Sequence, residues 1–290
     1  MAMSLADLQK AFAQKASGGG GGNQNWKLFF PFWKAAEDTT SIIRFLPDLN
    51  EDNEIGFLVE NHVHELMING EKKTVACLGM YGEACPICEL SRKYYDEKDD
   101  KLGKRYYRKR SYIGQCLVIE TPIEHNKDVL VKLIEFGPKI FQQIQAAFKS
   151  GDLEEVPYSF VGGYNFRIKK TKAGQYADYG TSTFAPKQSD VDPALIEKME
   201  MYDLAEYRAE RVERATLEAM LLADQTGQSY DTPASESADG DAASSSAAPA
   251  QAAQQAAPAP AAPPATSTQA NDIIAQLRAK AAAKKAAAGQ

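Results

Sequence analysis

Three cysteines stand close together in the stretch CLGMYGEACPICEL, which begins at Cys77. The whole chain holds only four cysteines, and Cys85 and Cys88 form a C-x2-C pair. Two thiolates at this spacing can reach one metal ion from a tight turn, and Cys77 can supply a third sulfur. The alternatives are a disulfide or small buried side chains. A metal held here would tie the surrounding segments together, so this cluster constrains the fold more than any other feature.

The rest of the chain bears on the redox state of these cysteines. The first residues, MAMSLADLQKAFAQKA, lack the apolar run of a secretory signal. No run of about 18 apolar residues is present, so we expect no membrane span. We therefore expect a reducing cytoplasm, where disulfides are disfavoured. With 290 residues, 44% of them hydrophobic, the chain can bury one sizeable core or two small ones.

A zinc ion would need a fourth ligand beside the three cysteines. Cys116 stands in the expected strand QCLVI, where a small core residue is the simpler interpretation. His62 and His64 share one face of the expected strand FLVENHVHEL, so either can point at the cysteines. His125 lies in an expected surface turn. We favour His64, and a closed set of three cysteines and one histidine predicts a single structural Zn2+ per chain.

Cations and tyrosines alternate shortly after the cysteine cluster. The residues concerned are Lys104, Arg105, Tyr106, Tyr107, Arg108, Lys109, Arg110 and Tyr112. Cations neutralise phosphates, and each tyrosine ring offers a face on which a base can stack, worth about 1–3 kcal/mol per base. The combination predicts a groove for a single-stranded nucleic acid. The alternative is a solvated basic helix face with incidental aromatic residues.

A second stretch, YNFRIKKTKAGQYADYGTSTF, predicts a strand, a turn and another strand. Its candidate nucleic-acid contacts are Arg167, Lys169, Tyr176, Tyr179 and Phe184. The two cations alternate with Phe166 and Ile168, so one face of the strand should point to a core and the other to water or ligand. For the two tyrosines, base stacking and packing at a sheet edge are equal alternatives.

Patterning predicts a mainly β fold with some helix, an α+β class. Strands are expected at 41–46, 55–66, 73–77, 111–120, 129–136 and 158–170, and helices at 138–149 and 192–223. These elements place the core within residues 23–223. Because the formal net charge is −6 and the negative charge lies mainly in the C-terminal third, a nucleic-acid surface must be a local basic patch.

Both ends of the chain differ from this core. Residues 1–22 predict a flexible N-terminal arm, an amphipathic helix followed by a glycine hinge. Residues 224–290 are rich in Ala, Pro and Ser and predict a disordered tail. Within the tail, residues 271–278 predict a short helix with an apolar patch, which suits docking to a partner.

Taken together, these motifs resemble the single-stranded DNA-binding, or helix-destabilising, proteins of T4-type bacteriophages. The matching pieces are WKL at 26–28, IIRFLP at 42–47, LVENHVHELMING before the first cysteine, CPIC at 85–88, RKRSY at 108–112 and FGPKIFQQI at 136–144. In the family pattern the ligand histidine stands thirteen residues before the first cysteine, which implies His64 rather than His62.

The resemblance implies an oligonucleotide-binding (OB-type) β-barrel with a zinc-bearing subdomain at about residues 60–112, and single-stranded DNA in the cleft between them. We add Arg44, in the IIRFLP segment, to the candidate DNA contacts. Implied partners are neighbouring copies on the strand, through the arm, and viral replication and recombination proteins, through the tail. The implied location is the cytoplasm of an infected bacterial host. The tail departs from the family pattern, because its end is basic rather than acidic.

These observations favour a sequence-tolerant protein that coats and protects single-stranded DNA during viral DNA replication, recombination and repair, without catalysis. An RNA-binding translational regulator is the main alternative, because base stacking alone does not exclude RNA. A zinc-dependent nucleic-acid enzyme is a weaker alternative. The chain contains no His-Glu-x-x-His, Gly-x-Ser-x-Gly or Gly-x4-Gly-Lys-Ser/Thr motif to support it.

Overall fold

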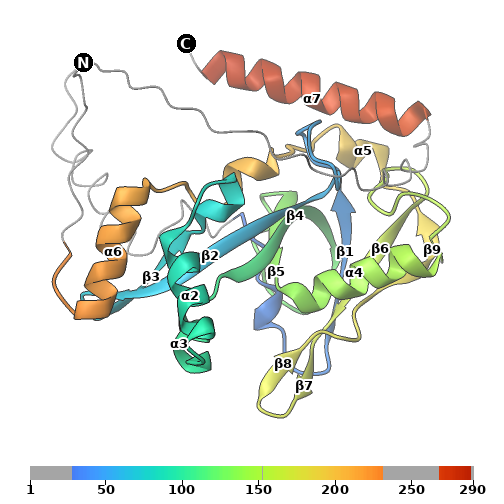
Figure 1. The fold of residues 1–290 in the computed structure, drawn as a ribbon. Helices are drawn as coiled ribbons and strands as arrows, with labels where there is room; N and C mark the ends of the chain where they lie inside the picture. The colour runs from blue at the N-terminus through green and yellow to red at the C-terminus, as the bar shows by residue number, and fades with distance from the viewer. Residues whose placement is uncertain (1–27, 152, 231–267, 289–290) are drawn as a thin grey trace, which may run out of the picture.

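The structure is a computed structural model that describes residues 28–151, 153–230 and 268–288. The expected arm at residues 1–22 and residues 231–267 of the expected tail lie outside this part of the chain. Helices flank an antiparallel sheet (Figure 1), so the predicted α+β class is confirmed. None of the helices within the described ranges is long and apolar enough to cross a membrane.

Seven of the strands in the described residues form one sheet. They are β1 (Thr40–Leu46), β2 (Leu58–Ile68), β3 (Glu71–Ala76), β4 (Lys109–Glu120), β5 (Val131–Phe136), β6 (Gly163–Lys169) and β9 (Thr183–Ser189). The order is β3-β2-β4-β1-β6-β9, with β5 also paired to β4, and every pairing is antiparallel. A separate hairpin of β7 (Thr171–Ala173) and β8 (Tyr176–Asp178) projects between β6 and β9. The expected strand–turn–strand is therefore two sheet strands joined through this hairpin.

The long strand β4 joins the two halves of the sheet. Its first half pairs with β2 and its second half with β1, while β5 pairs along the opposite edge. The partner changes between Gly114, opposite Leu58, and Gln115, opposite Leu46. A Cβ at position 114 would lie 2.7 Å from the Leu58 side chain and 3.2 Å from the Phe57 carbonyl oxygen. Glycine therefore allows the strand ends to meet here.

The expected OB-type barrel is wrong in one respect, because the sheet is not closed. Among the described strands, β3 and β9 end the strand order, and each pairs with a single neighbour. Helix α4 (Pro138–Ser150) contacts both β4 and β9. The result is an open, curved antiparallel sheet with a helix across one face (Figure 1).

Phenylalanine rings fill the space between the sheet and α4. The ring centroids of Phe45 and Phe57 lie 5.3 Å apart, and those of Phe166 and Phe184 lie 4.9 Å apart, both edge-to-face. The helix itself starts with proline at its first position, where the missing N–H costs nothing. Its observed bounds confirm the helix predicted at 138–149. Each buried phenylalanine stabilises the fold by about 1.5–3 kcal/mol.

A second apolar cluster lies at the far end of β2 and β3. Around it pack α2 (Pro86–Asp96), α3 (Asp100–Tyr106) and α6 (Arg214–Thr226). Its buried residues include Leu66, Ile68, Val75, Leu78, Ile87, Tyr106, Leu217, Met220 and Leu221. Because α6 comes from outside the expected subdomain, two separate parts of the chain build this unit. We call residues 60–112 together with α6 the cysteine lobe.

The long helix expected at residues 192–223 is wrong. The segment contains a short α5 (Pro193–Ile196), a 3-10 turn η3 (Leu204–Tyr207) and then α6. At and just before η3, backbone N–H groups are used by side chains of other segments of the core. The N–H of Leu204 donates to Asp48 (3.1 Å), and that of Tyr202 donates to Gln115 (2.9 Å). A continuous helix would need the same N–H groups for its own hydrogen bonds.

Two helices also change the expected C-terminal boundary. α6 runs past residue 223, where the core was expected to end. A helix α7 (Thr268–Ala288) replaces the shorter one expected at 271–278. It lies beside α5 on one side of the molecule, away from α2 and α3 (Figure 1). Residues 268–288 of the expected tail are therefore helical and in contact with the core.

Candidate metal centre and nucleic-acid interface

The β2–β3 hairpin positions the first members of the cysteine cluster. Asn69 and Gly70 form its two-residue turn, with φ of 54° and 78°. Asn-Gly is the sequence that favours such a turn, and a turn of fixed length fixes the strand register. In this register the N–H of Cys77 donates to the His62 carbonyl (2.9 Å). The hairpin therefore brings Cys77 alongside the histidines of β2.

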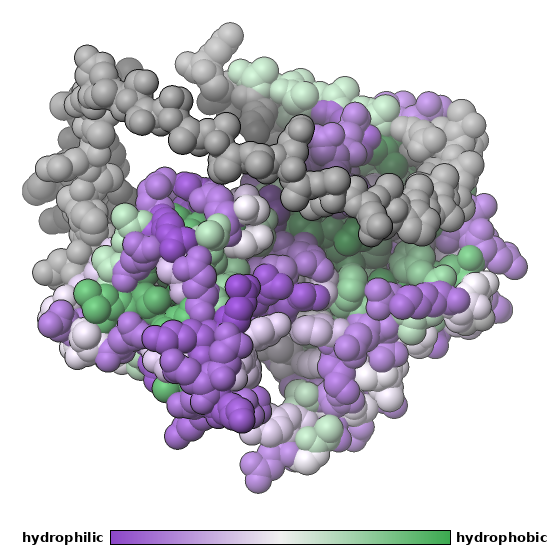
Figure 2. Space-filling model, viewed as in Figure 1, coloured by the Kyte–Doolittle hydropathy of each residue, from purple (hydrophilic) through white to green (hydrophobic). Residues whose placement is uncertain are grey.

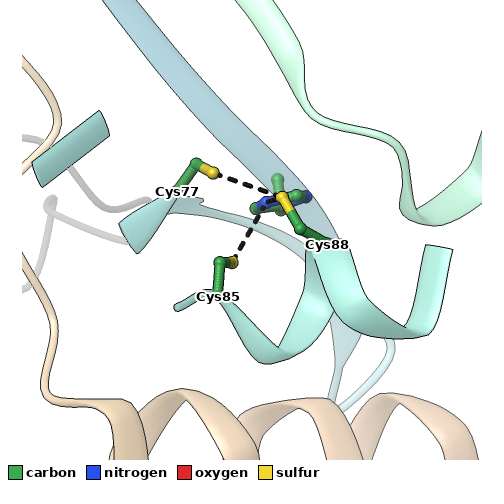
Figure 3. Close-up of side chains that lie close together, drawn as sticks. Cys77, Cys85 and Cys88 are labelled. Atoms are coloured by element: carbon green, nitrogen blue, oxygen red, sulfur yellow. Dashed lines mark hydrogen bonds between the residues drawn. The ribbon is translucent and has the colours of Figure 1, made fainter. Parts of the chain in front are cut away.

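Four side chains converge beside this hairpin. His64 Nε2 lies 3.5 Å from the sulfur of Cys85 and 3.5 Å from that of Cys88. The sulfurs of Cys77 and Cys88 are also 3.5 Å apart, and all four ligand atoms lie within 4.8 Å of one another. Figure 3 shows the three cysteine side chains pointing toward one another, two of them from the start of α2. The structure thus brings together the four residues predicted as ligands.

The geometry of this cluster fits a tetrahedral zinc ion. Zinc–sulfur distances near 2.3 Å and zinc–nitrogen distances near 2.0 Å place neighbouring ligand atoms roughly 3.3–3.8 Å apart. His64 Nδ1 donates to the Tyr106 carbonyl (2.9 Å), which leaves Nε2 to face the sulfurs. His62 instead points its Nε2 at Glu60 (3.0 Å). The choice between the two histidines, open from alternation alone, therefore falls on His64.

Protonation in the cluster also suits a metal. Hydrogen bonds from the thiols of Cys77 and Cys88 lower the pKa of Cys85. Burial opposes a charge on His64, but its contacts with Cys77 and Cys85 raise its pKa to about 9. The cluster therefore combines a thiolate with a proton held on the imidazole. A metal ion would replace that proton, since metal ligands bind in their deprotonated forms.

The remaining cysteine and histidine lie elsewhere, as predicted. Cys116 is fully buried in the sheet core, and burial raises the pKa of its thiol, which stays neutral. His125 Nδ1 lies 3.2 Å from the Ile123 carbonyl in a loop. Neither belongs to the cluster found among the described residues.

Two tyrosines predicted to stack on bases are core residues instead. Tyr106 is 4% exposed, stacks on Tyr94 at 5.8 Å, and donates its hydroxyl to Asp224 (2.7 Å). Tyr112 stacks on Phe141 with ring centroids 3.8 Å apart. Their rings stabilise the cysteine lobe and the sheet core, respectively. Neither ring face is open to a ligand.

Arg44 and Phe184, also predicted as DNA contacts, are buried in this structure. Arg44 is 1% exposed, and its guanidinium donates to the carbonyl oxygens of Ser159 (3.1 Å) and Ser189 (2.8 Å). It also donates to the Asn165 side chain (3.0 Å). Burial lowers its pKa to about 10, so it remains a cation at neutral pH. Phe184 belongs to the aromatic core described above.

A pocket of about 300 Å³ opens beside the metal cluster. It is lined by Cys88, Ser91, Arg92, Tyr95, Tyr107 and Arg108. Tyr107 is 54% exposed, and its ring lies edge-to-face with that of Tyr95 at 6.4 Å. Gly103 leaves room for the Tyr95 ring, which would lie 2.9 Å from a Cβ at that position. The pocket therefore combines an exposed ring with two arginines.

Sequence reasoning missed Arg92 as a member of this site. The available signal was helical spacing, because Cys88, Arg92 and Tyr95 follow one another at intervals of four and three residues. Residues at such intervals share a helix face, so the face that carries Cys88 of the cluster also lines the pocket.

The predicted cations divide into two groups. Arg105 pairs with Asp224 (2.9 Å), and Lys109 pairs with Glu65, so these two are engaged within the protein. Lys104 and Arg110 are exposed. Figure 2 shows hydrophilic residues over α2 and α3, with the surface hollowed between the cysteine lobe and the part that carries β7 and β8.

The second predicted stretch borders this hollow from the other side. Arg167 and Lys169 are exposed while the residues between and beside them are buried, which confirms the predicted alternation along β6. Tyr176, on the hairpin, is 79% exposed. Tyr179 instead packs edge-to-face on Phe32 at 5.3 Å, which favours edge packing over base stacking.

Comparison with known proteins places these features in a family. A family model described as "gp32 DNA binding protein like" matches residues 37–223. The single-stranded DNA-binding protein of Enterobacteria phage T2 is 26% identical over 219 residues, which cover 70% of this chain and 71% of the relative. The protein of the same name from Enterobacteria phage T4 is 26% identical over 190 residues, which cover 60% and 62%. The matched range contains the metal cluster, the pocket and β6, and it ends before α7.

Proposed function

Because the chain belongs to the family of gp32-like DNA-binding proteins, we propose that it binds and coats single-stranded DNA during viral DNA replication, recombination and repair. The pocket beside the metal cluster carries this proposal. There an exposed aromatic ring, Tyr107, lies next to Arg92 and Arg108. A ring beside two cations matches the base and phosphate of one nucleotide.

The chemistry of the pocket explains selectivity for an unpaired strand. A base can stack on Tyr107 only after it has left its duplex partner, so binding stabilises the open form of DNA. Every base has a π-face, so this contact does not depend on sequence. Phosphates on either side would meet Arg92 and Arg108, with Lys104, Arg110, Arg167, Lys169 and Tyr176 as further contacts along the hollow. Such ionic contacts make affinity fall steeply with salt.

The metal supports this site without taking part in chemistry. We propose one Zn2+ per chain, held by His64, Cys77, Cys85 and Cys88. Four protein ligands leave no open position for water or substrate, which is the arrangement of structural zinc. The ion would fasten the end of β3 to the start of α2, and α2 provides one wall of the pocket. We therefore propose a binding protein and not an enzyme, in line with the names of its relatives.

Further partners and the location are proposed from the family. Neighbouring copies on the strand and viral replication and recombination proteins are the partners, the latter through residues 224–290. The proposed place of action is the cytoplasm of an infected bacterial host. The phage origin of the relatives supports both proposals.

A binding titration tests the proposed function. The full chain, with its metal content measured on the same sample, is titrated with mixed-sequence single-stranded DNA, duplex DNA and RNA at two salt concentrations. We expect single-stranded DNA to bind most tightly, with a strong loss of affinity at the higher salt. Preference for duplex DNA, or no binding by metal-loaded protein, would contradict the proposal. Equal or tighter binding to RNA would favour the RNA-binding alternative.

An arginine variant tests whether the pocket contacts the DNA. Arg92→Ala should weaken single-stranded DNA binding and reduce the slope of log affinity against log salt by about 0.7, the effect of one lost phosphate contact on a single strand. Lys198→Ala, an exposed cation near α5, is the matched control and should leave both values unchanged. If the two variants behave alike, the pocket is not the contact site.

A further inference from the structure

Helix α7 is seated on the core by an apolar stripe. Leu277 is 7% exposed, with Ile273 and Ile274 half-buried beside it. Leu277 lies in a cluster with Leu46, Leu117, Val131, Phe160, Val191, Met199 and Met201. The three apolar side chains of α7 stand three and four residues apart, so they share one helix face. Because α7 lies outside the range matched by the family model, the family does not account for this contact.

Polar contacts also hold α7 on the core, and they favour a helix with positively charged side chains. Arg278 donates to the Leu49 carbonyl (3.0 Å) and pairs with Glu51 (2.9 Å). Lys280 donates to the Glu197 carbonyl (2.8 Å). A cavity of about 460 Å³ remains between α7 and the core. Leu277, Arg278 and Lys280 of α7 line one side of it, and the acidic residues Glu200, Asp203 and Glu206 help to line the other. These acidic residues complement the basic side chains of α7, and the apolar cluster beneath them accommodates its three apolar side chains; together they form the groove in which α7 docks.

The groove is placed so that it stays accessible when DNA is bound. Figure 1 shows α7 beside α5, on the other side of the molecule from α2 and α3 and their pocket. Residues 231–267 connect α7 to the rest of the chain. A connection of that length could span more than about 100 Å if fully extended. It is therefore long enough for α7 to reach the groove of an adjacent molecule as well as its own.

We propose that α7 exchanges between copies, so that the helix of one molecule occupies the groove of its neighbour on the same DNA strand. This inference rests on the proposed function. An exchanged helix makes the same contacts as one docked on its own core, so the exchange loses no interaction. The local concentration of grooves then decides the balance. Copies bound side by side present their grooves at an effective concentration on the order of millimolar, which dilute protein does not reach.

Removing the apolar anchor is the first test. The full chain and its Leu277→Asp variant are titrated with long poly(dT) and with an oligo(dT) that holds one copy. Wild-type protein should bind long poly(dT) more tightly per site than the short oligo(dT). The variant should lose up to about twofold of that advantage, because a neighbouring groove adds to an own groove that is presented at a similar effective concentration. Its affinity for the short oligo(dT) should not change.

A charge exchange separates docking on a neighbour from docking on the same chain. Arg278→Glu and Glu51→Arg each place like charges together when the helix docks on its own core. Mixed in equal amounts, the two variants regain opposite charges only across molecules. We expect each single variant to lose up to about twofold of the contiguous-binding advantage, because its helix docks less well on its own core and on that of an identical neighbour. The mixture should recover it, and the Glu51→Arg/Arg278→Glu double variant serves as the control that recovers both modes.

The outcomes of these experiments test the helix exchange separately from the proposed binding of single-stranded DNA. Failure to bind the short oligo(dT) would refute the proposed function and the exchange with it. Normal binding to the short oligo(dT), with the same contiguous-binding advantage in wild type and Leu277→Asp, would refute the exchange alone. Recovery in the double variant but not in the mixture would also refute it, because α7 would then dock only on its own core.

Discussion

Beneath α4, phenylalanine rings from four strands pack directly on one another, whereas in the cysteine lobe four ligand side chains converge on one point. The sheet core is stabilised by buried aromatic area. The lobe has smaller buried side chains and depends on its ligand cluster and on the cover provided by α6. Within this lobe Tyr107 is exposed, at the pocket beside the cluster. The two regions therefore divide stability and binding between them.

Removal of the metal should have the largest effect and should act on the cysteine lobe alone. Binding energies of structural zinc in small domains reach about 10–16 kcal/mol, so its loss should unfold the lobe. We expect Cys85→Ser, or chelation of the wild type, to abolish single-stranded DNA binding while the sheet core keeps its protection in hydrogen exchange. Acidification should act in the same direction, because protonated thiols do not bind zinc.

Cys116→Ala is the matched control for this experiment, since it removes a buried thiol outside the cluster. It should keep one zinc per chain and normal DNA binding. Equal loss of zinc in both variants would mean that the cluster is not the metal site.

Truncation of a core ring should have the next largest effect, and it should act on the sheet. Phe45 contacts four other phenylalanine rings, so Phe45→Ala should lower the free energy of unfolding by about 3–5 kcal/mol. Zinc content should stay at one per chain in the folded variant. Denaturant unfolding followed by circular dichroism measures the loss, with Phe45→Leu as the milder control. A simultaneous loss of zinc would show that the two regions do not fold independently.

Local patterns made part of this architecture predictable. The C-x2-C pair, the strands with alternating residues and the helix at 138–149 all depend on neighbours within a few residues, and the structure has them. The choice of His64 needed either the family resemblance or the structure, because alternation places both histidines of β2 on one face. The convergence of His64 with the three cysteines was thus the most predictable part of the site.

Contacts between distant parts of the chain account for what was missed. Tyr106 is buried because Asp224, far along the chain, accepts its hydroxyl, and no local pattern distinguishes it from Tyr107. Arg44 carries the same charge as a DNA-binding residue, but carbonyl oxygens from two distant segments surround it. The open sheet likewise depends on α4 meeting β4 and β9. Each of these outcomes depends on three-dimensional packing and not on local pattern.

Two arginines on neighbouring strands differ in the same way, one contributing to stability and the other to the proposed binding of DNA. Arg44 on β1 is buried and bonded to backbone carbonyls, whereas Arg167 on β6 is exposed. Arg44→Ala should lower the free energy of unfolding by about 2–3 kcal/mol, because buried acceptors lose a charged donor. Arg167→Ala should change stability by less than about 0.5 kcal/mol and should instead weaken DNA binding. Thermal unfolding measures the effect on stability, and DNA titrations at several salt concentrations measure the effect on binding. A loss of binding without a loss of stability in Arg44→Ala would contradict the burial of Arg44.

The smallest effect is expected from one ring, and adjacent tyrosines provide its test. Tyr107→Ala should weaken single-stranded DNA binding by about 1–3 kcal/mol, the value of one stacked base, and leave the melting temperature nearly unchanged. Tyr107→Phe keeps the ring and should bind almost normally. Tyr106→Ala should instead lower the melting temperature, because its ring is buried and burial together with Asp224 raises its pKa to about 12, so the hydroxyl remains a donor. If both alanine variants lost binding without losing stability, Tyr106 would have to turn outward when DNA binds. The cysteine lobe would then rearrange when DNA binds. The two regions would differ in how much they move on binding, as well as in what stabilises them.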